Sequence, residues 1–306
     1  MAWGFNDMPD QTGKLAVITG ANSGIGYETA RMLAAKNATV ILACRNEMKG
    51  NEALLKIKEE YPEAEVKVEL LDTSSLSSVR GFAKRFYDQY SKLDLLINNA
   101  GIFGGSTSIT DDGLELHMAT NYFGHFCLAG LLLNGLEAAG NARVIALSSQ
   151  SHRGATIDFS TLNSDEKITP IKRYAKTKLA ILIFSFELQR RLEEAGSSVI
   201  SLAANPGTTS SALGKDSLLL DFLLNSKFAT WIGISHSSEA GAVITLRAAT
   251  DPDARGSIFY GPSGGGRNLT GPPELEEPSP KALDQSVAEK LWQVSEELTG
   301  IRYLSS

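Results

Sequence analysis

Two residues of one predicted helix, Tyr174 and Lys178, carry side chains that could perform acid/base chemistry. Their spacing places both on the same helix face, so a phenol and an ammonium can share one site. A free phenol titrates near ~10, and a nearby cation favours its ionised form. We therefore expect Lys178, with an oxidised nicotinamide, to lower the pKa of Tyr174. The spacing alone leaves packing or surface exposure open as the role of Tyr174.

A glycine-rich turn far upstream, Thr19 to Gly26, follows the apolar run Leu15 to Ile18 and precedes a helical segment near Tyr27. A strand, closely spaced glycines and a helix together form a dinucleotide-binding turn, because backbone N–H groups and the helix N-terminus can approach a pyrophosphate. The predicted cofactor contacts of this turn are Gly20, Asn22, Ser23, Gly24, Ile25 and Gly26.

The residue that follows the second predicted strand indicates which nicotinamide cofactor is preferred. In NAD-binding units an acidic residue at this position binds the ribose 2′-hydroxyl. Here the strand ends Ala43-Cys44-Arg45 with no acid before Arg45, and a guanidinium can bind a 2′-phosphate. We therefore expect NADP(H) in preference to NAD(H). The alternative is that Arg45 is a solvated residue at the start of a helix.

Three further positions follow predicted strands. Asp72 could bind the adenine amine or could cap the next helix, which begins near Ser75. The segment Asn98–Gly101 could let a cofactor pass close to the backbone, through Asn99, Ala100 and Gly101, or could be a plain turn. Ser149, after the fifth strand, could bind a substrate oxygen.

Apolar runs rich in Val, Ile and Leu alternate with segments of helical periodicity, which predicts βαβ units. The fold class is therefore α/β: one doubly wound parallel sheet of the Rossmann type, with about seven strands and helices on both faces. We expect a single domain over residues 13–262, after an extension over 1–12, and a surface loop and docked helix over 263–306. The predicted strands are Leu15–Thr19, Thr39–Ala43, Glu65–Leu71, Leu93–Asn98, Arg143–Ser148, Ser198–Ala204 and Ser257–Tyr260.

Composition narrows the function further. A net charge of −6 and the lack of a basic block argue against a nucleic-acid partner. The two cysteines, Cys44 and Cys127, favour a reducing, cytoplasmic setting, and the polar N-terminus suggests neither a signal peptide nor a membrane anchor. The four histidines have no metal-ligand spacing with Cys, Asp or Glu, so we expect no metal site.

The motifs together resemble those of the classical short-chain dehydrogenases/reductases. The matching positions are the glycine turn, Asn98–Gly101, Asn121, Ser149, Tyr174 with Lys178, and Asn205-Pro206-Gly207. The resemblance implies that Tyr174 is the catalytic acid/base and that Lys178 binds the nicotinamide ribose. It also implies that Ser149 orients the substrate and that Asn121 holds a water in a proton relay to Lys178. Pro206, Gly207 and Thr208 or Thr209 would then meet the nicotinamide.

Within that family, the segments Ala43–Arg45, Asn121–His125 and Ser148–His152 resemble the retinol dehydrogenase and WW-domain oxidoreductase branch, in its soluble, bacterial-like form. Members of this branch mostly use NADP, which agrees with Arg45. The apolar segment 207–236 suggests a small apolar carbonyl or alcohol substrate. The resemblance allows a homodimer or a homotetramer.

Two other functions stay open at this point. A non-catalytic NADP-binding sensor or scaffold could keep the fold, although all four catalytic positions are present. An epimerase or dehydratase of the same fold is disfavoured by the glycine spacing and the short tail. Of the remaining polar residues, His152 is either a substrate contact or a satisfied loop histidine. The acidic cluster Glu274, Glu276 and Glu277 is expected to be solvated surface.

Overall fold

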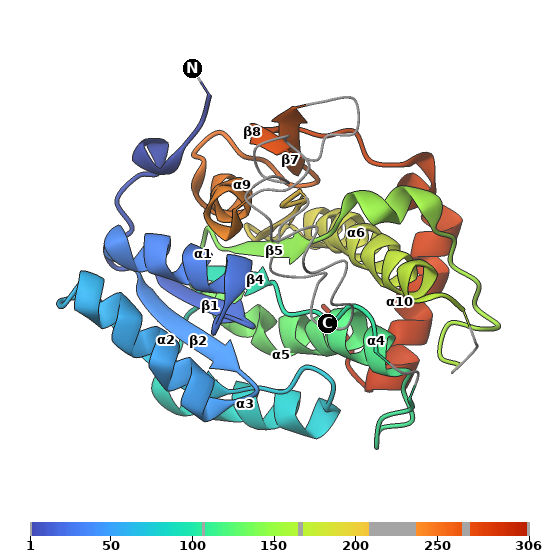
Figure 1. Cartoon of the computed structure of the whole chain (residues 1–306). Helices are drawn as coiled ribbons and strands as arrows, with labels where there is room; N and C mark the ends of the chain where they lie inside the picture. Colours follow the sequence, from blue (N-terminus) through green and yellow to red (C-terminus); the bar gives the residue numbers. More distant parts are fainter. Residues whose placement is uncertain (1, 106–107, 165–167, 208–236, 265–269, 305–306) are drawn as a thin grey trace.

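The computed structural model describes residues 2–105, 108–164, 168–207, 237–264 and 270–304. Its centre is one eight-stranded sheet in the order β3-β2-β1-β4-β5-β6-β7-β8, with every pairing parallel except the last (Figure 1). The predicted doubly wound sheet is confirmed, with an eighth strand. The strands are β1 (Leu15–Thr19), β2 (Thr39–Cys44), β3 (Val66–Leu70), β4 (Leu95–Asn98), β5 (Arg143–Leu147), β6 (Ile200–Ala204), β7 (Phe259–Gly264) and β8 (Thr270–Leu275).

Alternate residues of the central strands supply two separate cores, as the period of a strand requires. Val17 of β1 packs in one core, while its neighbours Ala16 and Ile18 pack in the other. The first core lies under α3 (Leu76–Gln89), α5 (Gly124–Ala139) and α6 (Pro170–Glu194). The second lies under α1 (Gly24–Ala35), α2 (Glu47–Glu60) and α9 (Ser238–Thr250). Strands buried on both faces explain why their sequences are continuous apolar runs.

The remaining elements are short, apart from one C-terminal helix. They are η1 (Phe5–Asp7), α4 (Leu116–Met118), the π-helical segment η2 (Ala119–Phe123), η3 (Gln150–Gly154), η4 (Pro280–Leu283) and α10 (Gln285–Thr299). Helix α10 packs on α5 and α6 through Trp292, whose ring lies 5.1 Å from that of Phe126 and 6.0 Å from that of Phe184.

The segment after β7 is not only the surface loop that the sequence suggests. Thr270–Leu275 forms β8, which pairs antiparallel with β7 at the edge of the sheet. The prediction was wrong because Pro272 and Pro273 argue against a strand. At an edge, however, a proline's missing N–H can face away from the ladder. The consequence is that the chain after β8 returns to the start of β7, beside the carboxyl ends of β5 and β6.

The strand order reverses between β1 and β4. In open α/β sheets, ligands bind beyond the carboxyl ends of the strands at such a reversal. Thr19 ends β1 and Asn98 ends β4, so the glycine turn and the Asn98–Gly101 segment lie on opposite sides of this crevice.

Helix α5 passes so close to the segment after β3 that only glycine fits at position 124. A Cβ there would lie 2.0 Å from the carbonyl oxygen of Thr73. We expect Gly124→Ala to lower the free energy of unfolding by at least about 1–3 kcal/mol, as overpacking does. Urea unfolding checks this, with Gly135→Ala in the same helix as control, where the nearest atom lies at 3.4 Å. Equal stabilities of the two variants would contradict the steric account.

Candidate active site

The side chain of Thr19 joins the two turns that border the crevice. Its Oγ1 accepts hydrogen bonds from the backbone N–H groups of Asn99 at 2.9 Å and Ala100 at 2.8 Å. In return, the amide of Asn99 donates to the Thr19 carbonyl oxygen at 2.7 Å. The predicted cofactor segments are therefore brought together and fixed to each other.

The glycine turn has the geometry of a dinucleotide cradle. Gly20 and Gly24 have φ values of +67° and +59°, which favour glycine. A Cβ on Gly26 would lie 2.4 Å from the Asn99 amide nitrogen, so a side chain would fill the space. Ser23 occupies the N-cap of α1 but makes no side-chain capping bond. The N–H groups at this helix end therefore suit a phosphate, and the residues present fit a nicotinamide dinucleotide.

Arg45 and Asp72 follow β2 and β3, on the same side of the reversal as the glycine turn. Arg45 is exposed, and within the described residues it makes no hydrogen bond or ion pair. Asp72 is not the cap of α3: that role belongs to Ser75, whose side chain accepts from the N–H of Ser78. Asp72 instead accepts from the N–H and hydroxyl of Ser74 at 2.9 and 2.6 Å. Its contact with adenine stays a prediction.

Helix α6 carries Tyr174 and Lys178 to the carboxyl end of β5. Its start is set by Thr169, which accepts from the N–H of Lys172, and by Pro170 in the first turn. The Lys178 ammonium donates to the carbonyl oxygen of Leu147 at 2.8 Å and lies 5.3 Å from the centre of the Tyr174 ring. The tyrosine and the lysine thus share one site, as their spacing predicts.

Burial governs the titration of both groups in the protein alone. Desolvation lowers the pKa of Lys178 to about 8. Desolvation also raises the pKa of Tyr174 to about 12, against the opposing effect of a hydrogen bond with Ser149. In the protein alone, the low polarity around the phenol disfavours the phenolate. That Lys178 and an oxidised nicotinamide together lower the tyrosine pKa stays a prediction.

The three serines after β5 have different surroundings. The Ser148 hydroxyl is buried and donates to the backbone carbonyl of Lys178 at 2.8 Å. The Ser149 side chain lies close enough to Tyr174 to lower the pKa of the phenol, and it accepts from the N–H of Ser151 at 3.3 Å. Among these serines, Ser149 is the one in contact with the tyrosine, which supports the predicted assignment.

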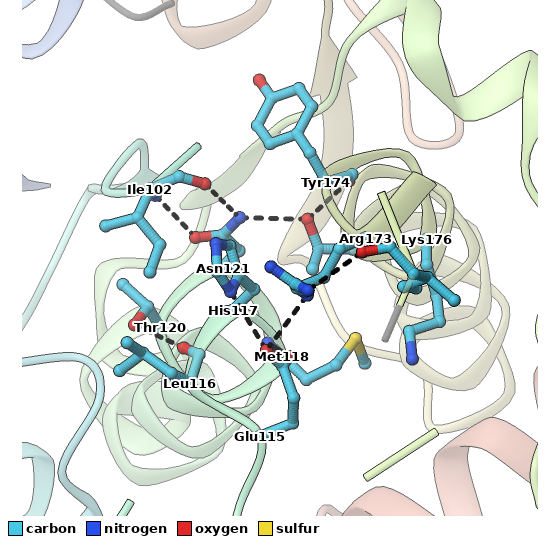
Figure 2. Close-up of polar contacts among 12 residues, drawn as sticks. Ile102, Glu115, Leu116, His117, Met118, Thr120, Asn121, Arg173, Tyr174 and Lys176 are labelled. Carbon is cyan, nitrogen blue, oxygen red and sulfur yellow. Dashed lines mark hydrogen bonds and ion pairs between the residues drawn. The ribbon is translucent and has the colours of Figure 1, made fainter. Parts of the chain in front are cut away.

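Asn121 lies in the π-helical segment η2, a feature that often marks functional positions. Its amide oxygen accepts from the N–H of Ile102 at 2.8 Å. Its nitrogen donates to the Ile102 carbonyl at 3.1 Å and to the Thr177 hydroxyl at 3.0 Å (Figure 2). Thr177 in turn donates to the Tyr174 carbonyl at 2.8 Å. Asn121 thereby ties the segment after β4 to the helix that carries Tyr174 and Lys178.

His125, a residue that the sequence motifs do not assign, links Asn121 to Thr19. Its Nδ1 lies 2.9 Å from the Asn121 carbonyl oxygen and its Nε2 lies 2.8 Å from the Thr19 hydroxyl. A carbonyl only accepts, so Nδ1 carries the proton and Thr19 donates to Nε2. Burial lowers the pKa of His125 to about 4, which keeps the ring neutral. In the sequence, His125 was marked by its position four residues after Asn121 and by the resemblance of the segment Asn121–His125 to the retinol dehydrogenase branch, neither of which gives it a role.

A second group not identified from the sequence lies beside Asn121. Arg173 Nε lies 3.8 Å from Glu115 Oε1, and His117 Nδ1 lies 3.0 Å from the same oxygen (Figure 2). His117 Nε2 contacts the Gly104 carbonyl oxygen at 2.7 Å. All three side chains are buried. The group ties the residue before Tyr174 to the chain after β4.

The remaining predicted residues divide into two groups. Pro206 and Gly207 follow β6, and the N–H of Gly207, whose φ is +76°, donates to the Asn205 side chain at 3.1 Å. Thr208 and Thr209, with most of the apolar segment 207–236, lie outside the described residues. Within the described part of the chain, no group of three or more His, Cys, Asp or Glu residues could hold a metal ion.

Comparison with known proteins decides the family. The family model described as short chain dehydrogenase matches residues 14–218. The chain belongs to this family. It is 38% identical over 294 residues to human retinol dehydrogenase 12, covering 95% of this chain and 88% of that protein. It is 37% identical over 314 residues to a short chain dehydrogenase/reductase of Colletotrichum higginsianum, covering 96% and 76% respectively. This short-chain dehydrogenase therefore lies in the retinol dehydrogenase-like branch.

Solved structures agree with the fold. A crystal structure of an uncharacterized protein from Mycobacterium paratuberculosis superposes with a TM-score of 0.82 at 38% identity, covering 100% of both chains. A short chain dehydrogenase from Shigella flexneri complexed with NADP has a TM-score of 0.64 at 20% identity, covering 82% of this chain and 98% of that chain, and so supports the fold alone. Members of the family bind a nicotinamide cofactor, and the cradle described above fits one.

The pKa of Lys178 gives a test that needs no substrate. With a pKa of about 8 in the folded chain against 10.5 ordinarily, folding releases its proton between those values. The contribution of Lys178 to the free energy of unfolding is therefore greatest above pH 10.5, where the lysine is neutral in both states, and it is lost as the pH falls through about 8. We expect a lysine resonance that titrates near pH 8 in carbon NMR spectra and is absent from Lys178→Met. Lys172→Met, on the exposed start of α6, is the control. Titration of every lysine near its ordinary value would contradict the desolvation of Lys178.

Proposed function

We propose that this short-chain dehydrogenase transfers a hydride between NADP(H) and a small apolar carbonyl or alcohol, with Tyr174 as the acid/base. The observation that carries the proposal is the meeting of Tyr174, Lys178 and Ser149 at the carboxyl end of β5. The crevice between β1 and β4 adjoins that site across the Asn121 contacts. When bound, the cofactor supplies or accepts the hydride.

Different residues of the site orient the substrate oxygen and transfer a proton to it. The Ser149 hydroxyl orients the oxygen, and the Tyr174 hydroxyl gives it a proton during reduction. Because burial raises the pKa of Tyr174 to about 12, the tyrosine is protonated near neutral pH and ready to donate. Lys178, held by the Leu147 carbonyl, favours the phenolate that forms when the proton leaves. Asn121 holds a water in a proton relay to Lys178 and fixes the distance between the segment after β4 and α6.

The cofactor contacts assign different parts of the dinucleotide to different segments. The glycine turn from Gly20 to Gly26 binds the pyrophosphate, and Arg45 binds the 2′-phosphate. Asp72 binds the adenine amine, while Pro206 and Gly207 approach the nicotinamide. An exposed guanidinium without a partner among the described residues supports the preference for NADP(H).

The substrate class rests on the relatives. Proteins named retinol dehydrogenase 12 and, in the mouse at 36% identity, polyprenol dehydrogenase cover most of this chain. We infer a substrate with an apolar body and an alcohol or aldehyde group. The alternative, a non-catalytic NADP-binding sensor or scaffold, would bind the cofactor without turnover. No described helix is long and apolar enough to cross a membrane. A cytoplasmic location and a homodimer or homotetramer remain predictions.

Removing the tyrosine hydroxyl tests the acid/base. We expect Tyr174→Phe to lower kcat by at least about 10²–10⁴-fold, the usual contribution of a general acid, with NADPH affinity changed only a few-fold. Oxidation of NADPH against a panel of apolar aldehydes and ketones measures this, with exposed Tyr87→Phe as control. Full activity of Tyr174→Phe would remove the proposed acid, and binding without turnover in the natural chain would favour the sensor.

Removing the guanidinium tests the cofactor preference. We expect Arg45→Ala to weaken NADPH binding by at least about tenfold, as the loss of a charge-assisted phosphate contact does, and to leave NADH affinity nearly unchanged. Titration of both cofactors measures the two dissociation constants. Lys49→Ala, an exposed cation at the start of α2, is the control for loss of charge alone. An equal loss for both cofactors would contradict a 2′-phosphate contact.

A further inference from the structure

One residue of the predicted solvated acidic cluster is buried. Only 2% of the Glu276 side chain is exposed, while Glu274 and Glu277 on either side are exposed. The prediction was wrong for Glu276 because it directly follows β8, the strand that was expected to be a surface loop. A buried carboxylate is costly unless its oxygens accept hydrogen bonds, so its partners indicate what holds it there.

Both carboxylate oxygens of Glu276 accept hydrogen bonds from side chains of distant segments. Oε2 accepts from the Asn205 amide at 2.8 Å. Oε1 accepts from the Gln150 amide at 2.7 Å and from the Arg153 guanidinium at 3.2 Å. Burial raises the pKa of Glu276, against the opposing effect of these three donors. Every partner donates, so the ionised carboxylate is the form that satisfies all of them.

These partners belong to the two turns that flank the proposed reacting atoms. Gln150 directly follows Ser149 at the end of β5. Asn205 directly precedes Pro206 and Gly207, and its amide oxygen accepts from the N–H of Gly207 at 3.1 Å. The Glu276 carboxylate therefore bridges two turns by hydrogen bonds. One turn carries Ser149, which is proposed to bind the substrate, and the other is proposed to approach the nicotinamide.

The backbone leaves space for this carboxylate and fixes its position. A Cβ on Gly261 of β7 would lie 1.9 Å from Glu276 Oε2, so any side chain at position 261 would displace this carboxylate. The N–H of Glu276 donates to the Phe259 carbonyl at 2.7 Å, and the N–H of Asn205 donates to the Tyr260 carbonyl at the same distance. The backbones of Glu276 and Asn205 are thus both hydrogen-bonded to the same strand, β7.

The residues after Glu276 hold the Ser149 turn as well. The N–H of Ser279 donates to His152 Nε2 at 3.2 Å, which leaves the proton of this ring on Nδ1. Nδ1 then donates to the Ser149 carbonyl at 2.7 Å. His152 is therefore a satisfied loop histidine, the second of the two roles that its sequence position allowed. The segment 276–279 contacts the serine turn at two separate points.

We propose that Glu276 is a positioning residue for hydride transfer, whose carboxylate sets the separation between the Ser149 turn and the Asn205–Gly207 turn. This inference rests on the proposed function, since it concerns the reactants that these turns hold. A displacement of about 1 Å between reacting groups can cost on the order of 100-fold in rate. Loss of the carboxylate should therefore slow the hydride step more than it weakens cofactor binding, because the glycine turn and Arg45 lie elsewhere.

Reversing the hydrogen bond between Glu276 and Asn205 tests this. In Glu276→Gln, the introduced N–H₂ meets a donor in either orientation: the Asn205 amide on one side, or the Gln150 amide and the Arg153 guanidinium on the other. If Asn205 flips to accept from it, the bond between Asn205 and Gly207 is lost. In Asn205→Asp, two carboxylates face each other. In the double variant, the introduced amide donates to one oxygen of the introduced carboxylate, whose other oxygen accepts from the N–H of Gly207. Glu274→Gln is the matched control, since Glu274 is exposed two residues away.

The readouts are kcat, KM, the isotope effect with NADPH deuterated at the transferred position, and thermal stability. We expect each single variant to lower kcat at least about tenfold and to raise the isotope effect, with KM for NADPH changed less than about threefold. The double variant should regain most of kcat, a coupling that independent sites would not show. A merely structural role would lower stability but leave kcat per folded enzyme and the isotope effect unchanged, and this would overturn the proposal.

The fluorescence of bound NADPH can be measured without a substrate. It therefore tests the role of Glu276 even if the proposed function fails. If the natural chain turns over no carbonyl, the proposed function fails. The position of the nicotinamide is then read from its fluorescence in the natural chain, the two single variants and the double variant. Altered emission in both single variants, restored in the double variant, would support the role of Glu276. Identical emission in all four proteins would overturn it.

Discussion

The hydroxyl of Thr19 is the contact on which the geometry of the cofactor crevice depends. This oxygen accepts from the backbone N–H groups of Asn99 and Ala100 and donates to the ring of His125. Its residue ends β1, so the contact fixes the glycine turn against the turn that follows β4. Without it, two N–H groups would lack an acceptor, at about 1–3 kcal/mol for each that is buried. The reversal of strand order opens the crevice, and this hydroxyl sets its width.

His125 connects the cofactor crevice to the helix that carries Tyr174 and Lys178. His125 donates to the Asn121 carbonyl, and the Asn121 amide bonds the Thr177 hydroxyl between Tyr174 and Lys178. A neutral ring with one donor and one acceptor is required for this chain of bonds. Burial, which lowers the pKa of His125 to about 4, keeps it in that state throughout the neutral range. The crevice and the pair Tyr174 and Lys178 are thus connected by uncharged hydrogen bonds.

The sequence predicted the parts of the structure that depend on local pattern. The central strands β1, β2, β4, β5 and β6 are largely apolar runs because they are buried on both faces, and Tyr174 and Lys178 follow from helical spacing. Long-range contacts were not predictable in this way. The three partners that hold the buried Glu276 carboxylate, Asn205, Gln150 and Arg153, are 71, 126 and 123 residues away in the sequence. The prolines of β8 also argue against a strand. The raised pKa of Tyr174 likewise reflects desolvation by packed neighbours, which spacing along a helix does not report.

The C-terminal segment shows why motifs describe only part of such a site. The motifs found in the sequence mark the residues that are proposed to touch cofactor or substrate, and all of these residues precede β7. Glu276 belongs to none of these motifs, yet its two oxygens bond both of the turns that are proposed to hold the reactants. Its substitution would leave the identity of every motif residue unchanged while changing the distance between the two turns. Because hydride transfer depends more steeply on that distance than binding does, a residue of this kind acts on rate and leaves affinity largely unchanged. Residues with this effect must be sought in the contacts between turns rather than in the turns themselves.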